Sequence, residues 1–187
     1  MLIPDTPTPW GDEMHRFVLP LLLIASVGKS RAAPPPPPPP NLGCPGPEYR
    51  QFDFWAGKWS VTKTKDGQPA GSSEITVLDK GCSILESWTG ASGVTGHSIN
   101  VFDQADGKWH QTWVDGTGDQ VHYVGELKDG AMRFVSDDIA TPQRAPVKLT
   151  MTFEPRPDGT VRQSGTMSTD GGKTFQPSFD LVYTRVK

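Results

Sequence analysis

Six side chains on three expected strands are of the types that bind small polar molecules. The set consists of Glu86, Trp88, Ser98, Asn100, Gln111 and Trp113. Tryptophan offers a flat apolar face for stacking, whereas the other four residue types donate or accept hydrogen bonds. Because residues two apart along a strand share a face, each strand presents its own members of the set on one side. If these sides face one interior, they form a pocket, and we predict that these six residues bind a small-molecule ligand there.

The chemistry of this lining suits an amphipathic ligand. Stacking on Trp88 or Trp113 and hydrogen bonds to Asn100 and Gln111 would hold small glycans, aromatic metabolites or lipid head groups. A fatty acid would instead require an apolar interior with a cationic anchor. Arg162 is the one obvious arginine in a strand of the later half that could serve as such an anchor. We therefore expect a polar or aromatic ligand rather than a bare fatty acid.

Two other functions stay open, because alternation along a strand does not say which face is inside. A structural or protein-interaction module would have a filled interior and an exposed apolar patch. A periplasmic enzyme would use a buried carboxylate, since burial beside Trp88 would raise the pKa of Glu86 and suit it to general acid–base chemistry. The enzyme also needs a second reacting group, for which Asp53 and Asp115 are the candidates if the fold brings them close. We predict no catalytic residues.

The histidines and cysteines do not have the spacing of a metal or haem site. His97, His110 and His122 have no carboxylate at ligand spacing, and neither cysteine has a Cys or His partner nearby. His110 lies on the opposite strand face from Gln111, so it would not share a pocket with it. We predict no metal and no cofactor, with the histidines exposed or hydrogen-bonded in the core.

Cys44 and Cys82 are the two cysteines of the chain, and we predict that they form one disulfide. The bond would close a loop of almost forty residues and contribute roughly 4 kcal/mol on the chain-entropy model. It would tether the segment before the barrel to the third strand. The alternative is a lipid anchor on Cys44, since Leu42 and Gly43 precede it, although a proline run separates it from the apolar segment.

The N-terminal region has the pattern of an export signal. From Met14 a short basic segment leads into an apolar run and then into small residues that place cleavage near Ala32. The first thirteen residues contain acidic side chains that do not fit this pattern, so we place the true start at Met14. The run is shorter than the ~20 residues that span a bilayer. We predict a signal peptide over residues 1–33 and a periplasmic or secreted protein without a stable membrane span, the alternative being a buried N-terminal helix.

A proline-rich linker is expected over residues 34–48, because seven consecutive prolines from Pro34 to Pro40 form a stiff polyproline II segment. The domain then occupies residues 49–187. The net charge of −3, without any block of like charges, excludes a nucleic-acid partner. We expect a monomer.

The pattern after residue 57 alternates with period two between Asp-Gly and other turn signals, which predicts about ten short strands. The expected strands are 58–65, 72–79, 82–89, 96–103, 108–114, 121–127, 132–137, 147–153, 161–167 and a last strand that contains Phe179, Leu181 and Tyr183. A meander of this many strands closes or splits, and closure removes its edges. We predict an all-β fold with a single antiparallel up-and-down barrel, and a short helical turn over 47–54 that plugs one end.

Several motifs resemble those of one protein family. The opening segment Gln51 to Trp59 has the form FDFW-x-G-x-W, and further matches follow in order along the chain. They are Gly81-Cys82 with Glu86-Ser87-Trp88, Gly96 to Asn100 with Asp103, and Lys108 to Asp115. The chain resembles an uncharacterised family of secreted bacterial proteins over residues 44–185. That family is similar to the lipocalin and fatty-acid-binding-protein (calycin-like) barrels, which share a Gly-x-Trp near the first strand. The resemblance implies such a barrel, export, and Trp59 in the barrel floor.

The segment Ser168 to Phe175 fits the Asp-box pattern S-x-D-x-G-x-x-F. Asp-boxes recur in sialidase propellers, but one copy in a short chain does not make a propeller. We predict a hairpin turn in which Asp170 accepts backbone N–H bonds and Phe175 packs beneath it.

Overall fold

The computed structural model describes residues 43–141 and 144–186, which form eleven strands and three short 3₁₀ helices. The strands are β1 (Gly57–Lys63), β2 (Pro69–Leu78), β3 (Ser83–Gly90), β4 (Thr95–Asp103), β5 (Lys108–Asp115), β6 (Gln120–Lys128), β7 (Ala131–Ser136), β8 (Ile139–Thr141), β9 (Arg144–Pro155), β10 (Val161–Ser168) and β11 (Gln176–Arg185). The predicted signal peptide, the start at Met14 and the proline run lie outside the described residues.

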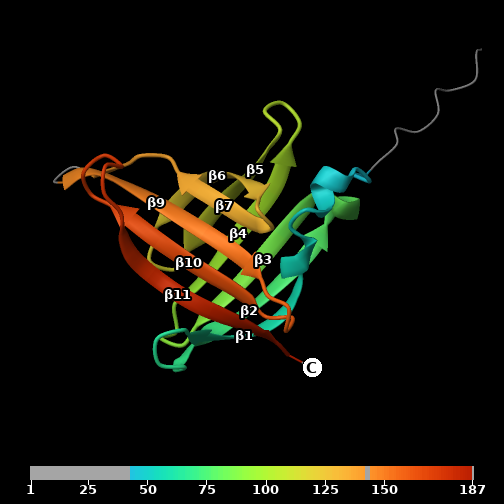
Figure 1. The fold of residues 1–187 in the computed structure, drawn as a ribbon, viewed down its shortest axis with the longest axis horizontal. Coiled ribbons are helices and arrows are strands. Elements are labelled where there is room, and N and C mark those ends of the chain that lie inside the picture. The colour runs from blue at the N-terminus through green and yellow to red at the C-terminus, as the bar shows by residue number, and fades with distance from the viewer. Residues whose placement is uncertain (1–42, 142–143, 187) are drawn as a thin grey trace, which may run out of the picture. The chain divides into compact units, whose positions relative to one another are not determined.

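Ten of these strands close into an antiparallel barrel (Figure 1). Each strand from β1 to β6 pairs with the strand that follows it, and β7 then pairs with β9. The pairs β9–β10 and β10–β11 follow, and β11 pairs with β1 to close the barrel. This arrangement confirms the predicted all-β, calycin-like up-and-down barrel. The sequence pattern missed β8, an additional strand of three residues that pairs with β9 alone. So short a strand with one neighbour shows no alternation that a pattern could reveal.

A helical segment plugs one end of the barrel, as predicted. It contains η1 (Pro47–Arg50) and η2 (Asp53–Trp55). Phe52 and Trp55 are fully buried and stack with ring centroids 4.9 Å apart, and Phe153 of β9 lies within 5.0 Å of both rings. Aromatic rings at these distances contribute both buried apolar area and favourable ring–ring contacts. This end of the barrel is therefore filled by side chains.

The Gly-x-Trp segment locks the plug onto the first and last strands. Trp59 is buried, as expected of a barrel-floor residue, and its Nε1 donates a hydrogen bond to the Trp55 carbonyl at 2.8 Å. The Arg185 guanidinium of β11 lies over the Trp59 ring at 4.3 Å and donates to the Ala56 carbonyl at 3.0 Å. Gly57 has φ +138°, and a Cβ there would meet this guanidinium at 2.4 Å. Only glycine fits this position without displacing the arginine.

A disulfide joins Cys44 to Cys82, with the two Cα atoms 4.9 Å apart, which confirms the predicted pairing. Cys82 directly precedes β3, and the third 3₁₀ helix, η3 (Asp79–Gly81), lies just before it. Arg50 of η1 donates a hydrogen bond to the Gly81 carbonyl beside the disulfide. The bond therefore fixes the plug to the β2–β3 connection, and it uses the sulfur that a lipid anchor on Cys44 would need.

The turns agree with their sequence signals. Asp129 and Gly130 both have positive φ, which is the type I′ geometry of a two-residue hairpin. In the Asp-box, the Asp170 carboxylate accepts the backbone N–H groups of Lys173 and Thr174 at 2.9 Å, as predicted. Phe175 is 37% exposed, and its ring lies near the turn, 4.0 Å from the position of a Cβ on Gly172. The hydrogen bonds to Asp170 thus hold the loop in its turn geometry.

Candidate functional site

A cavity of about 200 Å³ lies inside the barrel on the side away from the plug. Its lining residues are Glu86, Trp88, Gln111, Trp113, Tyr123, Met151, Gln163, Phe179, Leu181 and Tyr183. Trp88, Trp113 and Phe179 are half-buried and form its rim, whereas the glutamate, the two glutamines and the two tyrosines are buried deeper. An engineered cavity of about 150 Å³ in another protein admits benzene. The space therefore accommodates a ring with a few further atoms.

The structure brings all six predicted site residues together on the inside of the barrel. Glu86, Trp88, Gln111 and Trp113 line the cavity itself. Ser98 and Asn100 also face inward, but they are fully buried behind the lining and are not part of it. The register explains the grouping, because Ser98 pairs with Glu86 on one side and with Trp113 on the other. Ser98 and Asn100 thus support the lining residues and do not reach the cavity.

A directed chain of hydrogen bonds runs across β5, β4 and β3. The Gln111 Nε2 donates to Asn100 Oδ1 at 2.6 Å, Asn100 Nδ2 donates to Ser98 Oγ at 3.1 Å, and Ser98 Oγ donates to Glu86 Oε2 at 3.0 Å. Ser73 of β2 donates to the other carboxylate oxygen at 2.9 Å. Each Glu86 oxygen thus accepts one hydrogen bond, and the chain holds the carboxylate in a fixed orientation at the cavity wall.

Burial raises the pKa of Glu86 to about 7, although the hydrogen bonds from Ser73 and Ser98 oppose that shift. The cause is desolvation, which disfavours the charged form of a carboxyl group. Among the described residues, no lysine, arginine or histidine is buried with it. The two serines are neutral donors, so no buried side chain of the described residues supplies a positive charge to balance an ionised Glu86.

Sequence reasoning missed a second polar group, which faces the cavity from β9, β10 and β11. The Tyr183 hydroxyl donates to Gln163 Oε1 at 2.7 Å, and Gln163 Nε2 lies 2.9 Å from the Met151 sulfur. Burial, with a further contribution from the Glu86 charge, raises the pKa of Tyr183 well above its ordinary value. Burial also raises the pKa of Tyr123 to about 12. The sequence signal for this inward face was that Val161 and Gln163 share one side of their strand. It was ambiguous because Arg162 and Ser164, on the other side, are polar as Gln163 is.

The arginine considered as a fatty-acid anchor lies outside the barrel. Arg162 forms a two-bond ion pair with Asp180, at 2.9 and 2.7 Å, and approaches Glu154 at 3.7 Å. The pKa of Asp180 is lowered, chiefly by its hydrogen bond from Arg162. Since Arg162 faces away from the cavity, it offers no cationic anchor to an internal ligand.

The two aspartates considered as catalytic partners of Glu86 do not line the cavity either. Asp53 belongs to the plug and pairs with Arg50 at 3.2 Å. Asp115 is the last residue of β5, where hydrogen bonds from Thr117 lower its pKa. The fold therefore does not bring them to Glu86.

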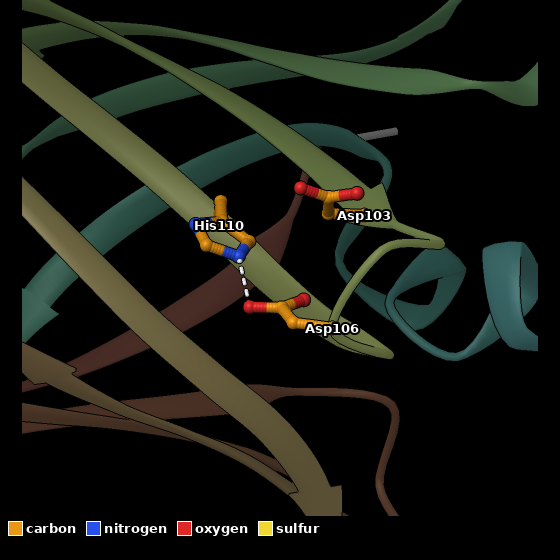
Figure 2. Close-up of side chains that lie close together, drawn as sticks. All are labelled: Asp103, Asp106 and His110. Atoms are coloured by element: carbon orange, nitrogen blue, oxygen red, sulfur yellow. Dashed lines mark hydrogen bonds and ion pairs between the residues drawn. The ribbon is translucent and has the colours of Figure 1, made fainter.

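The histidines lie on the outer side of the barrel, and one of them belongs to a cluster that the sequence interpretation missed. Figure 2 shows Asp103 at the end of β4, Asp106 in the following turn and His110 on β5. One ligand-type atom from each lies within 4.8 Å of the others, a grouping that could hold a metal ion. The expectation that no carboxylate lies at ligand spacing from a histidine is therefore wrong, because the hairpin folds Asp103 and Asp106 back onto β5.

Hydrogen bonds of the hairpin account for this closeness. His110 Nε2 lies 2.9 Å from Asp106 Oδ2, and the other carboxylate oxygen of Asp106 accepts the Lys108 N–H. Asp103 accepts the Ala105 N–H at 2.8 Å. On its far side His110 contacts His122, which in turn contacts Asp137. The cluster is an exposed, hydrogen-bonded surface feature, separate from the cavity.

None of the helices in the described ranges is long and apolar enough to cross a membrane. A search of protein-family models finds no match to the chain, and a search of curated proteins finds none either. The functional argument therefore depends on the cavity and its chemistry.

Proposed function

We propose that this protein is an exported barrel that binds a small molecule in its internal cavity. The observation that carries the proposal is the lining, in which Trp88 and Trp113 stand beside the buried polar groups of Glu86, Gln111 and Gln163. Ligand sites combine apolar walls with a few fixed polar groups in this way. The chain of hydrogen bonds behind Glu86 and Gln111 supports a preformed site, because it orients both side chains without a ligand.

A binding role explains the cavity better than the two alternatives. A purely structural module would fill this space, since an empty volume loses packing contacts. An acid–base enzyme built on Glu86 would need a second group that exchanges protons near neutral pH. Among the described lining residues, Glu86 has a pKa of about 7, whereas burial moves the tyrosine pKa values further from neutrality. A single group of this kind, Glu86, supports ligand binding more directly than catalysis.

We also propose export to the periplasm or the exterior and membership of the secreted family with the FDFW-x-G-x-W opening. The Cys44–Cys82 disulfide supports export, because such bonds persist in oxidising compartments. The contact of Trp59 with the Trp55 carbonyl gives the Gly-x-Trp motif a structural role in this barrel. N-terminal sequencing of the secreted chain tests export, and a mature protein that begins at Met1 or Met14 would contradict it.

Titration of tryptophan fluorescence with a metabolite library tests the binding function. A ligand in the cavity should change the emission of Trp88 and Trp113, which lie at its rim. The Trp113→Ala variant should weaken binding by about 2 kcal/mol or more, as aromatic anchors do, while the barrel stays folded. Val135→Ala, on the outer surface, is the matched control and should bind normally. Unchanged emission across the library, together with a solvent-filled cavity in a crystal soaked with the same compounds, would refute the proposal.

A further inference from the structure

The charge inside the cavity points to the chemical class of the ligand, and this inference rests on the proposed binding function. We infer that the cavity binds a small organic cation, an amine attached to a ring or a short apolar group, with its ammonium group against the Glu86 carboxylate. The inference depends on three features of the described residues: an uncompensated acidic group, walls that favour positive charge, and a limited volume.

Glu86 is the acidic group. It lines the cavity, is 4% exposed, and is the one carboxylate among the described buried residues. Its oxygens each accept a hydrogen bond from a serine, which leaves lone pairs for further donors because an ionised carboxylate accepts about four. A buried charge without a partner is costly, and an incoming ammonium group would supply the missing charge. The carboxylate thus lacks a partner that a cationic ligand provides.

The walls around Glu86 favour a cation over an anion. Trp88, Trp113, Phe179 and Tyr123 contribute aromatic rings to the lining, and the faces of such rings attract positive charge. No lysine, arginine or histidine is part of the lining, and Arg162 points outward into its ion pair with Asp180. A ligand carboxylate would therefore meet the Glu86 charge without any compensating group. These contacts select against fatty acids and other small anions.

The volume limits the size of the ligand. About 200 Å³ accommodates one ring with a short polar arm. Gln111 of β5 and Gln163 of β10 add amide groups to the lining, so the cavity also offers neutral hydrogen-bonding groups to the rest of the ligand. The favoured ligands are thus monocyclic or compact amines.

Matched probes of one shape and different charge test the inference on the purified full chain. They are benzylamine, benzyl alcohol and benzoate, with 2-phenylethylamine and 2-phenylethanol as a second pair. Calorimetry or ligand-observed NMR at pH 8 should show that each amine binds at least tenfold more tightly than its alcohol, and that benzoate does not bind. Glu86→Gln, which keeps the shape of the side chain, should abolish the preference for the amine. Val135→Ala should leave it unchanged.

The pH dependence in the unmodified chain gives a second test that does not depend on a variant. The ammonium groups of these amines stay mostly charged to about pH 9, so between pH 5.5 and 8 the change comes from the protein. The titratable groups that face Glu86 across the barrel are Tyr123 and Tyr183, and burial keeps both neutral in this range. Amine affinity should therefore rise about tenfold between pH 6 and 8 as Glu86 ionises, with release of a proton on binding at pH 6.5. The affinity of the alcohols should stay flat.

The outcomes separate this inference from the proposed function. Equal binding of the amines and alcohols, with no effect of Glu86→Gln, would overturn the cationic class and leave the binding function in place. Tighter binding of an alcohol at low pH would point to a neutral ligand that accepts a hydrogen bond from protonated Glu86, and would also overturn it. If no amine binds while the metabolite library yields a neutral or anionic ligand, the inference again fails alone. If neither the amines nor any compound of the library binds, both the cationic class and the proposed binding function are refuted.

Discussion

The two halves of the barrel interior use the same strands for opposite purposes. Along β5, Trp109 is buried against the plug, Gln111 lies at mid-barrel and Trp113 stands at the cavity rim. Around Trp109 the interior is a close cluster of aromatic rings, with Phe52 at 5.7 Å between centroids. Around Trp113 the interior is hollow and carries a buried carboxylate. We call these two regions the packed half and the hollow half.

The comparison shows how a small barrel can contain an unfavourable site. Burial of Glu86 without a cation and an unfilled cavity both lower stability. Aromatic packing under the plug, the disulfide and the stacking of Arg185 on Trp59 all lie in the packed half. Stability and binding are therefore carried by different residues on common strands. Four changes test this division, in order of decreasing effect.

The largest effect is expected from removing a tryptophan of the packed half. Trp109→Ala should lower the free energy of unfolding by about 3–5 kcal/mol, because it leaves a cavity among buried rings. Trp113→Ala, four residues along the same strand, should cost about 1 kcal/mol or less, since its side chain is half-buried beside existing space. Urea denaturation monitored by circular dichroism measures both. Equal losses for the two variants would contradict the division.

Removing the disulfide should also act on the packed half alone. The Cys44→Ala/Cys82→Ala double variant should lose about 2–4 kcal/mol of unfolding free energy, because the unfolded chain regains the freedom of a long closed loop. Ligand affinity should be unchanged, since the bond lies at the plug and not at the cavity. Denaturant unfolding of the variant, compared with the oxidised parent protein, provides the measurement. A large loss of affinity in a folded variant would show that the halves are coupled.

Because the hollow half contains Glu86, it should make the free energy of unfolding depend on pH. The pKa of Glu86 is raised to about 7 in the folded protein from 4.5 when unfolded. Below pH 4.5 both states are protonated and the group has no effect; as pH rises toward 7 the unfolded state loses its proton first, so stability falls. Above pH 7 the full loss is roughly 3 kcal/mol. Glu86→Gln should therefore gain this amount over the parent at pH 8 and nothing at pH 4. Parallel pH dependences in the two proteins would contradict the assignment.

The sequence allowed the barrel and most of the packed half to be predicted, because alternation and Asp-Gly turns are local signals. Alternation along the strands predicted that Glu86, Gln111 and Trp113 point inward only on the condition that their strand faces line one interior. The roles of Ser98 and Asn100 behind the lining were not predictable, since depth along a strand depends on the register of its neighbours. Local pattern thus identifies a face but not how far its residues lie from a cavity.

The missed parts of the site depend on how the strands of a hairpin pair. Gln163 and Tyr183 meet because the β10–β11 hairpin pairs Gln163 with Leu181 and Val161 with Tyr183, a register that the sequence pattern does not fix. The closeness of Asp103 to His110 comes from the geometry of a hairpin rather than from linear spacing. Both cases show that polar groups are brought together by strand pairing, which a single sequence does not specify.

The smallest expected effect comes from adding volume to the hollow half. Leu181→Phe enlarges a half-buried residue of the cavity wall, where space exists for the ring. Ile84→Phe makes a change of similar size at a fully buried position of the core. Overpacking should cost the Ile84 variant about 1–3 kcal/mol of unfolding free energy, whereas the Leu181 variant should change by about 0.5 kcal/mol or less. Urea denaturation of both variants measures the difference, and ligand titration should show that Leu181→Phe loses affinity because the ring occupies the site. A Leu181 variant as unstable as the Ile84 variant would mean that the cavity is not free space, and the distinction between the two halves would have to be abandoned.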